Sequence, residues 1–230
     1  MAELSMGQAP GVDRSMMAWL QLLQLSDSAL PIGALSHSFG VESLVAEGGL
    51  DTADLPRFYA EWLAGAGHAD AVLCAMAHAV DSPGAWQQLN AMASAMRPAR
   101  ESRDASTRLG RRFLGLAAQL ENDERLRYPG DGHLAAAFGL VAAVLGIGAA
   151  EAAGAYLHQT LFGSVSACQR LLPLGQTVAM QLLWSMKPRM MAVIEQACAA
   201  PQWETLWNLQ PALEVASMRH PQLHTRLFIS

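Results

Sequence analysis

The sequence predicts an all-α protein, a single-domain bundle of about ten helices with no sheet. Apolar residues recur at three- and four-residue spacing along most of the chain, which is typical of helices that bury one face. Glycine and proline interrupt these stretches where helices of ordinary length would end. The alternating pattern of β-branched residues that predicts strands is missing.

The pattern divides the chain into three parts. Residues 1–14 are expected to be a flexible N-terminal tail, because the stretch up to Gly11 is aperiodic and contains glycine and proline. Residues 15–210 are expected to form the all-α domain. Residues 211–230 follow the last helix of that domain and are expected to form a C-terminal tail that binds a partner.

The first helix is expected over Ser15–Asp27, and the second ends near Val45, before a pair of glycines. Between them lies a polar segment, Asp27–Glu42, that contains Pro31, Gly33 and Gly40. Proline cannot donate a backbone hydrogen bond, and glycine allows dihedral angles and close contacts that other residues resist. This corner segment is either a rigid turn between two helices or a working surface.

The middle of the chain gives clear helix starts. Thr52 or Asp54 can begin one helix, and Ser82 followed by Pro83 begins another. From Arg97 to Arg127 the chain becomes rich in charged residues at helical spacing. This face is either simply solvated or a docking surface for an acidic or nucleotide-handling partner.

The segment after it is nearly free of charge. Between Tyr128 and Met186 the only fully charged residues are Asp131, Glu151 and Arg170. The apolar run 134–150 is interrupted by glycine and slightly short for a bilayer, so we expect a buried central helix pair rather than a membrane span. Since so much apolar surface is hard to cover within one chain, we predict a homodimer built largely from residues 133–186.

A second helix break lies at Pro173, Gly175 and Gln176. We predict that it packs against the first corner, residues 31–40, because two helix breaks can satisfy each other's unpaired backbone groups. In that arrangement Gln176 or Ser36 would bond the helix ends of the opposite segment.

Composition excludes several classes of function. The net charge of −5 and the scattered acids argue against nucleic-acid binding. Three widely separated cysteines fit a reducing cytoplasm, and no secretory signal is evident. Phosphate-binding glycine loops and the Gly-x-Ser-x-Gly motif of hydrolases are both missing.

A few polar residues stand out as candidate ligands. Glu42 follows the corner and could be a metal ligand, a first-turn acid or a salt-bridge partner. His220 and His224 lie four residues apart, although Pro221 makes an uninterrupted helix between them less favourable. One reading is therefore a hydrolytic metalloenzyme that uses Glu42, His37 and His220.

Four motifs, spread over nearly the whole chain, resemble a known family. Residues 30–42 read Leu-Pro-Ile-Gly-Ala-Leu-Ser-His-Ser-Phe-Gly-Val-Glu, and residues 100–114 contain a charged helix with a Gly-Arg-Arg-Phe-Leu end. Residues 172–177 read Leu-Pro-Leu-Gly-Gln-Thr, and residues 217–230 contain Ser-Met-Arg-His and Thr-Arg-Leu-Phe. Together they resemble the urease accessory protein UreF family. Ala34-Leu35, Pro221 and Ile229 depart from the family pattern.

The resemblance implies a cytoplasmic accessory protein that is not an enzyme. UreF-like proteins dimerise, bind UreD (also called UreH) and recruit the GTPase UreG, and together these proteins deliver Ni²⁺ to apo-urease. No tightly bound cofactor or firmly bound metal is expected, and nickel would be present only in transit. Neither nucleic acid nor a membrane is an expected partner.

The resemblance also assigns roles to individual residues. Family positions that match Glu42 and Arg170 are linked to metal passage or gating, and His37 is grouped with them. The family tail is associated with UreD binding, so the candidate partner-binding residues are Arg219, His220, Leu223, Arg226, Leu227 and Phe228. We expect residues 217–230 to contribute little to the fold and to order only on binding.

Overall fold

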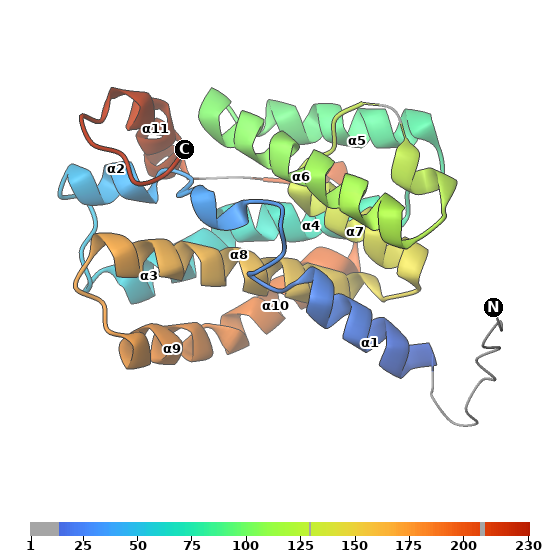
Figure 1. Cartoon of the computed structure of the whole chain (residues 1–230), viewed down its shortest axis with the longest axis horizontal. Helices are drawn as coiled ribbons and strands as arrows, with labels where there is room; N and C mark the ends of the chain where they lie inside the picture. Colours follow the sequence, from blue (N-terminus) through green and yellow to red (C-terminus); the bar gives the residue numbers. More distant parts are fainter. Residues whose placement is uncertain (1–13, 129, 208–209) are drawn as a thin grey trace, which may run out of the picture.

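The computed structural model describes residues 14–128, 130–207 and 210–230. Within them the chain is helical and contains no strand, so the all-α prediction is confirmed. Of the predicted N-terminal tail, residues 1–13 lie outside the described part, and Arg14 begins the first helix. The α-helices, labelled in Figure 1, are α1 (Arg14–Leu25), α2 (Val41–Ala46), α3 (Leu55–Trp62), α4 (His68–His78), α5 (Pro83–Ala95), α6 (Arg100–Leu120), α7 (Leu134–Leu145), α8 (Ala149–Leu171), α9 (Gln176–Ser185), α10 (Lys187–Ala199) and α11 (Pro211–Arg219).

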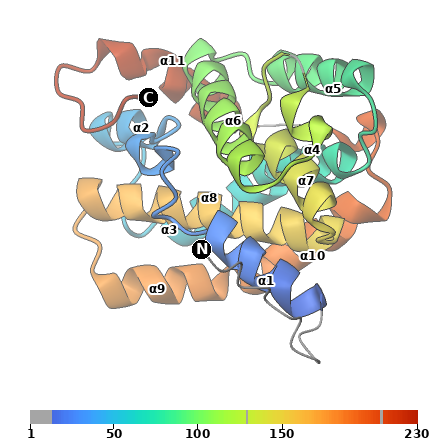
Figure 2. The ribbon, with the colours of Figure 1, turned by 45° about the vertical axis from the view of Figure 1, so that its right-hand side comes forward.

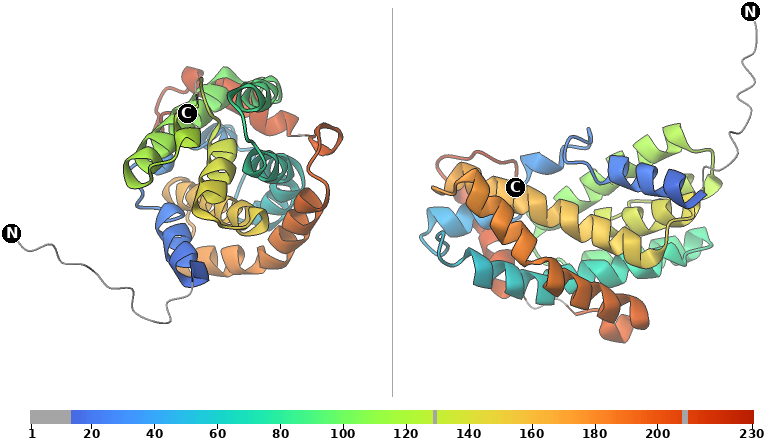
Figure 3. Two further views of the ribbon diagram at one scale, coloured as in Figure 1. Left: turned by 90° about the vertical axis from the view of Figure 1, so that its right-hand side faces the viewer. Right: turned by 90° about the horizontal axis from the view of Figure 1, so that it is seen from below.

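The apolar helix α7 lies in the middle of the bundle, packed against α4, α6 and α8 (Figure 3). Its residues from Leu134 to Ala142 are all buried. Phe138 stacks on Phe113 of α6 with 4.5 Å between ring centroids, and it meets Tyr156 of α8 edge-on at 5.7 Å. The predicted buried central helix is therefore present, as its apolar sequence requires.

The structure corrects one premise of the predicted homodimer. Neighbouring helices of the same chain cover α7, so most of the charge-poor segment needs no partner. Within that segment, the large apolar side chains left exposed are on α9: Trp184 is 78% exposed, Val178 55% and Met180 45%. A second exposed apolar group lies on α1 and consists of Met16, Met17, Trp19, Leu20 and Leu23.

Two glycines let the central helices approach each other closely. A side chain at Gly139 of α7 would collide with the backbone carbonyl of Cys74 on α4. A side chain at Gly110 of α6 would collide with the carbonyl of Gly132, just before α7. At these two places the backbones lie so close together that no side chain fits between them.

The ends of the helices follow the predicted chemistry at several points. The hydroxyl of Ser82 accepts the backbone N–H of Ala85 at 3.3 Å and caps α5, which begins with proline. The first turn of α6 is capped from a distance, because the carboxylate of Glu214 on α11 accepts the N–H of Ala99 at 2.9 Å. Helices α3 and α4 run continuously through a π-helical turn at Leu63–Gly67.

The two helix breaks do not satisfy each other as predicted. The α8–α9 connection places Leu174 in the core but leaves Gln176 exposed. Within the described residues, no hydrogen bond joins it to the corner, and the side chains of Gln176 and Ser36 make none. Pro173 and Gly175 end α8 and allow the turn into α9, whereas the corner finds its polar partners elsewhere.

Among the helices that the structure describes, none combines the length and the apolarity that crossing a membrane requires.

Candidate functional site

The C-terminal tail folds back over α2 and the corner segment, as Figures 1 and 2 show. Its anchor is Glu42 in the first turn of α2, a carboxylate that is only 3% exposed. One oxygen, Oε1, accepts the backbone N–H of Leu227 at 2.6 Å. The other, Oε2, accepts Nε2–H of His220 at 2.7 Å and the N–H of Phe228 at 3.3 Å. A buried carboxylate is stable only when bonded in this way.

These contacts overturn the prediction that the tail contributes little to the fold. His220 is 1% exposed and Phe228 5%, and helix α11 packs against α2. The tail supplies the partners of a buried charge and covers apolar surface. It is therefore part of the folded domain in this chain.

The corner has the backbone shape that lets the tail approach. Phe39 and Gly40 both have positive φ angles, 50° and 92°, which turn the chain sharply between the corner and α2. A Cβ on Gly40 would lie 2.7 Å from the carbonyl oxygen of Leu213 and from the hydroxyl of Ser217. Glycine at this position thus allows α11 to lie directly on the corner.

The corner and the end of the tail are joined by hydrogen bonds. The backbone N–H groups of Ser38 and Phe39 both donate to the carbonyl oxygen of Ser230, and so does the hydroxyl of Ser38 at 3.0 Å. In the other direction, the N–H of Ile229 donates to the carbonyl of Ser36 at 2.8 Å. The corner is therefore a turn that is bonded to the chain's own C-terminal tail, and a working surface at this place stays a prediction.

His37 lies inside this contact, with Nδ1 2.7 Å from the hydroxyl of Ser230. Burial, together with the positive charges of Arg108 and Arg112, lowers the pKa of His37 to about 4. The imidazole is consequently neutral at pH 7. A neutral imidazole can share a hydrogen bond with the hydroxyl of Ser230 without adding charge to the interior.

Two arginines reach the corner from the neighbouring helices. The guanidinium of Arg170, at the end of α8, lies 4.3 Å from the centroid of the Phe228 ring and 3.4 Å from the carbonyl oxygen of Leu35. Arg112 of α6 donates to the carbonyl of Ile32 at 3.0 Å. Both arginines are nevertheless exposed residues.

Most of the predicted site residues thus come together, although they are far apart in sequence. The clustered residues are His37, Glu42, Arg170, His220, Leu227 and Phe228. The other predicted partner-binding residues lie further out: Arg219 pairs with Glu47 at 3.0 Å, Leu223 is half-buried, and Arg226 is exposed.

The arrangement of these residues differs from what the metalloenzyme reading requires. Glu42 and His220 bond each other, while His37 bonds Ser230 instead of joining them around a common point. Among the residues that the structure describes, no group of three histidine, cysteine, aspartate or glutamate side chains is placed to hold a metal ion. The Nε2 atom of His78 lies 2.8 Å from the backbone carbonyl oxygen of Ile147.

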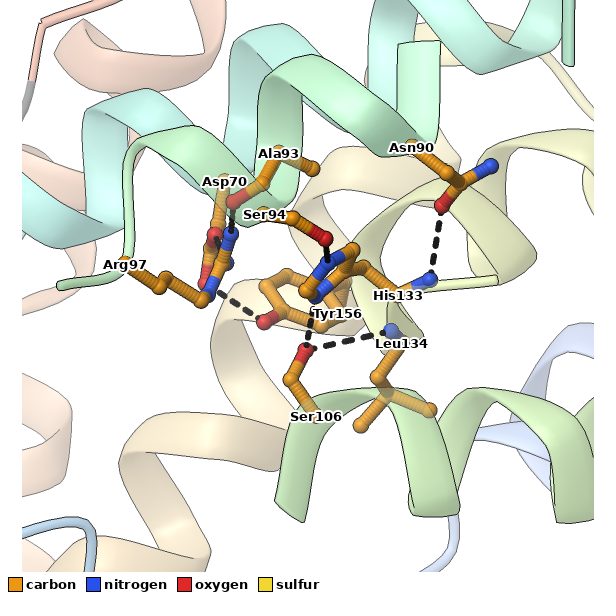
Figure 4. Close-up of polar contacts among 9 residues, drawn as sticks. All are labelled: Asp70, Asn90, Ala93, Ser94, Arg97, Ser106, His133, Leu134 and Tyr156. Atoms are coloured by element: carbon orange, nitrogen blue, oxygen red, sulfur yellow. Dashed lines mark hydrogen bonds and ion pairs between the residues drawn. The ribbon is translucent and has the colours of Figure 1, made fainter. Parts of the chain in front are cut away.

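A cavity of about 120 Å³ lies next to the docked tail, and its lining includes His37 and Ser38 of the corner. Its wall also contains a buried polar group that sequence reasoning missed: Asp70 of α4, Arg97 and Tyr156 (Figure 4). The Tyr156 hydroxyl donates to Oδ2 of Asp70 at 2.6 Å, and Arg97 forms an ion pair with Oδ1 of the same carboxylate. Burial and the Asp70 charge raise the pKa of Tyr156 well above its usual range, so it remains a donor.

Next to this group, His133 joins three helices at the start of α7 (Figure 4). The ring of His133 lies 2.8 Å from the hydroxyl of Ser94 on α5 and 3.1 Å from that of Ser106 on α6. The backbone N–H of His133 donates to Oδ1 of Asn90 at 2.7 Å. Burial, with the charges of nearby arginines, lowers its pKa to about 3. One signal could have pointed to these residues: Asp70 is a single acid within an otherwise apolar helix.

Comparison with known proteins supplies a family. A family model described as UreF matches residues 50–187. The urease accessory protein UreF of Cereibacter sphaeroides (strain ATCC 17023) is 34% identical over 213 residues, which cover 92% of this chain and 98% of the relative. Proteins of the same name from Paenarthrobacter aurescens (strain TC1) and Rhodopseudomonas palustris (strain BisB18) are each 33% identical, and the latter alignment covers 100% of this chain and 96% of the relative.

Proposed function

The chain belongs to the UreF family of urease accessory proteins, and from that premise we propose that it is a non-enzymatic adaptor for nickel insertion. In this proposal it acts in the cytoplasm, forms a homodimer, binds UreD (UreH) and recruits the GTPase UreG. The assembled complex then delivers Ni²⁺ to apo-urease.

One observation carries the proposal most directly. The residues that resemble the family's functional positions meet at one place, where the tail covers the corner. The groups in this contact hold the backbone in place, and they leave Arg226, Leu227 and Ile229 exposed. An ordered apolar and basic surface of this kind suits protein binding better than chemistry on a small substrate.

Nickel is the cargo in this proposal, and neither a resident metal nor a cofactor is part of it. A passage role for Glu42, His37 and Arg170 has one structural consequence. Both oxygens of Glu42 already accept hydrogen bonds from the tail, so the carboxylate could meet a passing ion only after those bonds are released.

The rival proposal is a hydrolytic metalloenzyme that uses Glu42, His37 and His220. The observed bonding disfavours it, because each histidine is held by a different partner. A purified chain that hydrolysed esters, amides or phosphates with a divalent metal and without partners would support this rival. We expect no such turnover.

The test is reconstitution. Urease genes would be expressed in cells that lack this chain, and urease activity and urease-bound nickel would be measured with the chain present and absent. We expect both to depend on the chain, and we expect the tagged chain to capture UreD, and UreG through that complex. Full nickel loading of urease without the chain would contradict the proposal.

A further inference from the structure

We infer that Glu42 is a positioning residue for protein binding: its carboxylate holds the tail so that Leu227 and Ile229 face outward as a preformed docking surface. This inference rests on the proposed function, in which the tail binds UreD. It gives Glu42 a role that needs no contact with a metal ion.

The burial pattern of the tail is the first observation behind it. Phe228 and Ser230 are 5% and 7% exposed, whereas Leu227, just before Phe228, and Ile229, between the two, are 55% and 60% exposed. Consecutive residues therefore point alternately into the protein and out of it. The apolar side chains of Leu227 and Ile229 are therefore held in solvent because Phe228 and Ser230 are buried.

The bonding explains what fixes them. Glu42 accepts the N–H groups of both Leu227 and Phe228, so this single side chain determines the backbone course at the exposed leucine. The carboxylate is 3% exposed and lies in the first turn of α2, which packs against α11. A rigid, buried anchor lowers the entropy that the tail would lose on binding a partner.

The surroundings indicate the chemistry of the partner surface. Leu35, 40% exposed in the corner, adds a further apolar side chain, and the guanidinium of Arg170 lies over the tail. Arg226 is exposed, and no ion pair is formed by it or by Arg170 within the described residues. The fitting partner surface is an apolar patch with carboxylates at its rim, and we assign it to UreD.

The experiment compares Glu42→Ala and Glu42→Gln with the wild-type full chain. Glu61→Gln is the matched control, because Glu61 is exposed on α3 and only its backbone carbonyl, not its carboxylate, accepts a hydrogen bond among the described residues. Amide hydrogen exchange reports the tail, and titration with purified UreD in the presence of EDTA reports binding without nickel.

In Glu42→Ala we expect fast exchange at Leu227 and Phe228, unchanged exchange in α7, and at least tenfold weaker binding of UreD. In Glu42→Gln, which keeps one carbonyl acceptor, we expect the same effects in smaller measure. If Glu42 only stabilised the fold, weaker binding of UreD would come with faster amide exchange in α7. Weaker binding with α7 still protected therefore indicates that Glu42 positions the tail. We expect that adding nickel back does not restore the affinity of either variant for UreD.

Two results would overturn the inference: tail amides that stay protected in Glu42→Ala, or freed tail amides with unchanged affinity for UreD. Failure of the proposed function looks different, since the wild-type chain itself would then fail to bind UreD. In that case the docking role would be rejected as well, on the wild-type result alone.

Discussion

Gly139 is a residue at which the fold depends on the absence of a side chain. It lies where α7 crosses α4, and a Cβ there would meet the backbone carbonyl of Cys74, which cannot move aside as a flexible side chain could. We expect Gly139→Ala to lower the free energy of unfolding by about 2 kcal/mol, the usual cost of overpacking a core. Urea denaturation measures the change.

Gly115 of α6 is the matched control for this substitution. It is exposed, and nothing lies within 4 Å of the position that a Cβ would take. Gly115→Ala should therefore be neutral or stabilising by about 0.5–1 kcal/mol, because alanine favours the helix. Equal destabilisation by both substitutions would show that helix crossing is not the cause.

His133 predicts how stability responds to pH. Its pKa is lowered to about 3 in the folded chain, below the ordinary histidine value of about 6.5 in the unfolded chain. The unfolded state therefore binds the proton more readily, so stability is complete above pH 6.5 and falls as the pH drops toward 3. We expect a loss on the order of 2–3 kcal/mol between pH 7 and pH 4 from this residue.

The measurement is the free energy of unfolding as a function of pH for the wild-type chain and for His133→Gln. The variant starts less stable, because it loses bonds to Ser94 and Ser106, but its stability should depend less on pH. Some dependence remains, since burial also lowers the pKa of His37 to about 4. An unchanged slope in the variant would contradict the assignment.

At the scale of elements, the tail is the segment whose removal tests the fold. Deleting residues 217–230 leaves Glu42 buried without its partners, and it exposes the surface that Phe228 covers. Leaving a buried carboxylate without its hydrogen-bond partners costs about 3–5 kcal/mol, so the melting midpoint should fall by several degrees. Calorimetry of the two chains measures the shift.

Leu227→Ala separates the fold from binding within the same element. The side chain is 55% exposed, so this change should leave the melting midpoint nearly the same. If deletion of the tail also left the midpoint unchanged, the docked arrangement would not hold in solution.

The elements also show what the sequence could predict. Ser82 and Pro83 correctly predicted the start of α5, because an N-cap involves only residues that are close in sequence. The cap of α6 could not be predicted in this way, since Glu214 reaches it from a helix more than a hundred residues away. The docking of the tail could not be predicted for the same reason. In the sequence Glu42 is only an acid in the first turn of a helix, and its partner His220 is 178 residues away.

At the scale of the whole molecule, the homodimer remains a prediction, and the exposed apolar side chains indicate which helices are candidates for its interface. The apolar side chains of α7, which were predicted to need a partner, are mostly covered by α4, α6 and α8. The exposed group on α9 that includes Met180 and Trp184 lies within the predicted 133–186 segment. Stable dimers bury apolar side chains at the centre of their interface, which this helix can supply.

We therefore expect Trp184→Glu to convert a dimer into a monomer at micromolar concentration, as measured by sedimentation. Trp184 is 78% exposed, so the folded monomer should tolerate the charge while a desolvated interface should not. Trp19→Glu, on the exposed face of α1, is the control and should keep the dimer. The reverse pattern would move the interface to α1, and a wild-type chain that sediments as a monomer would reject the homodimer altogether.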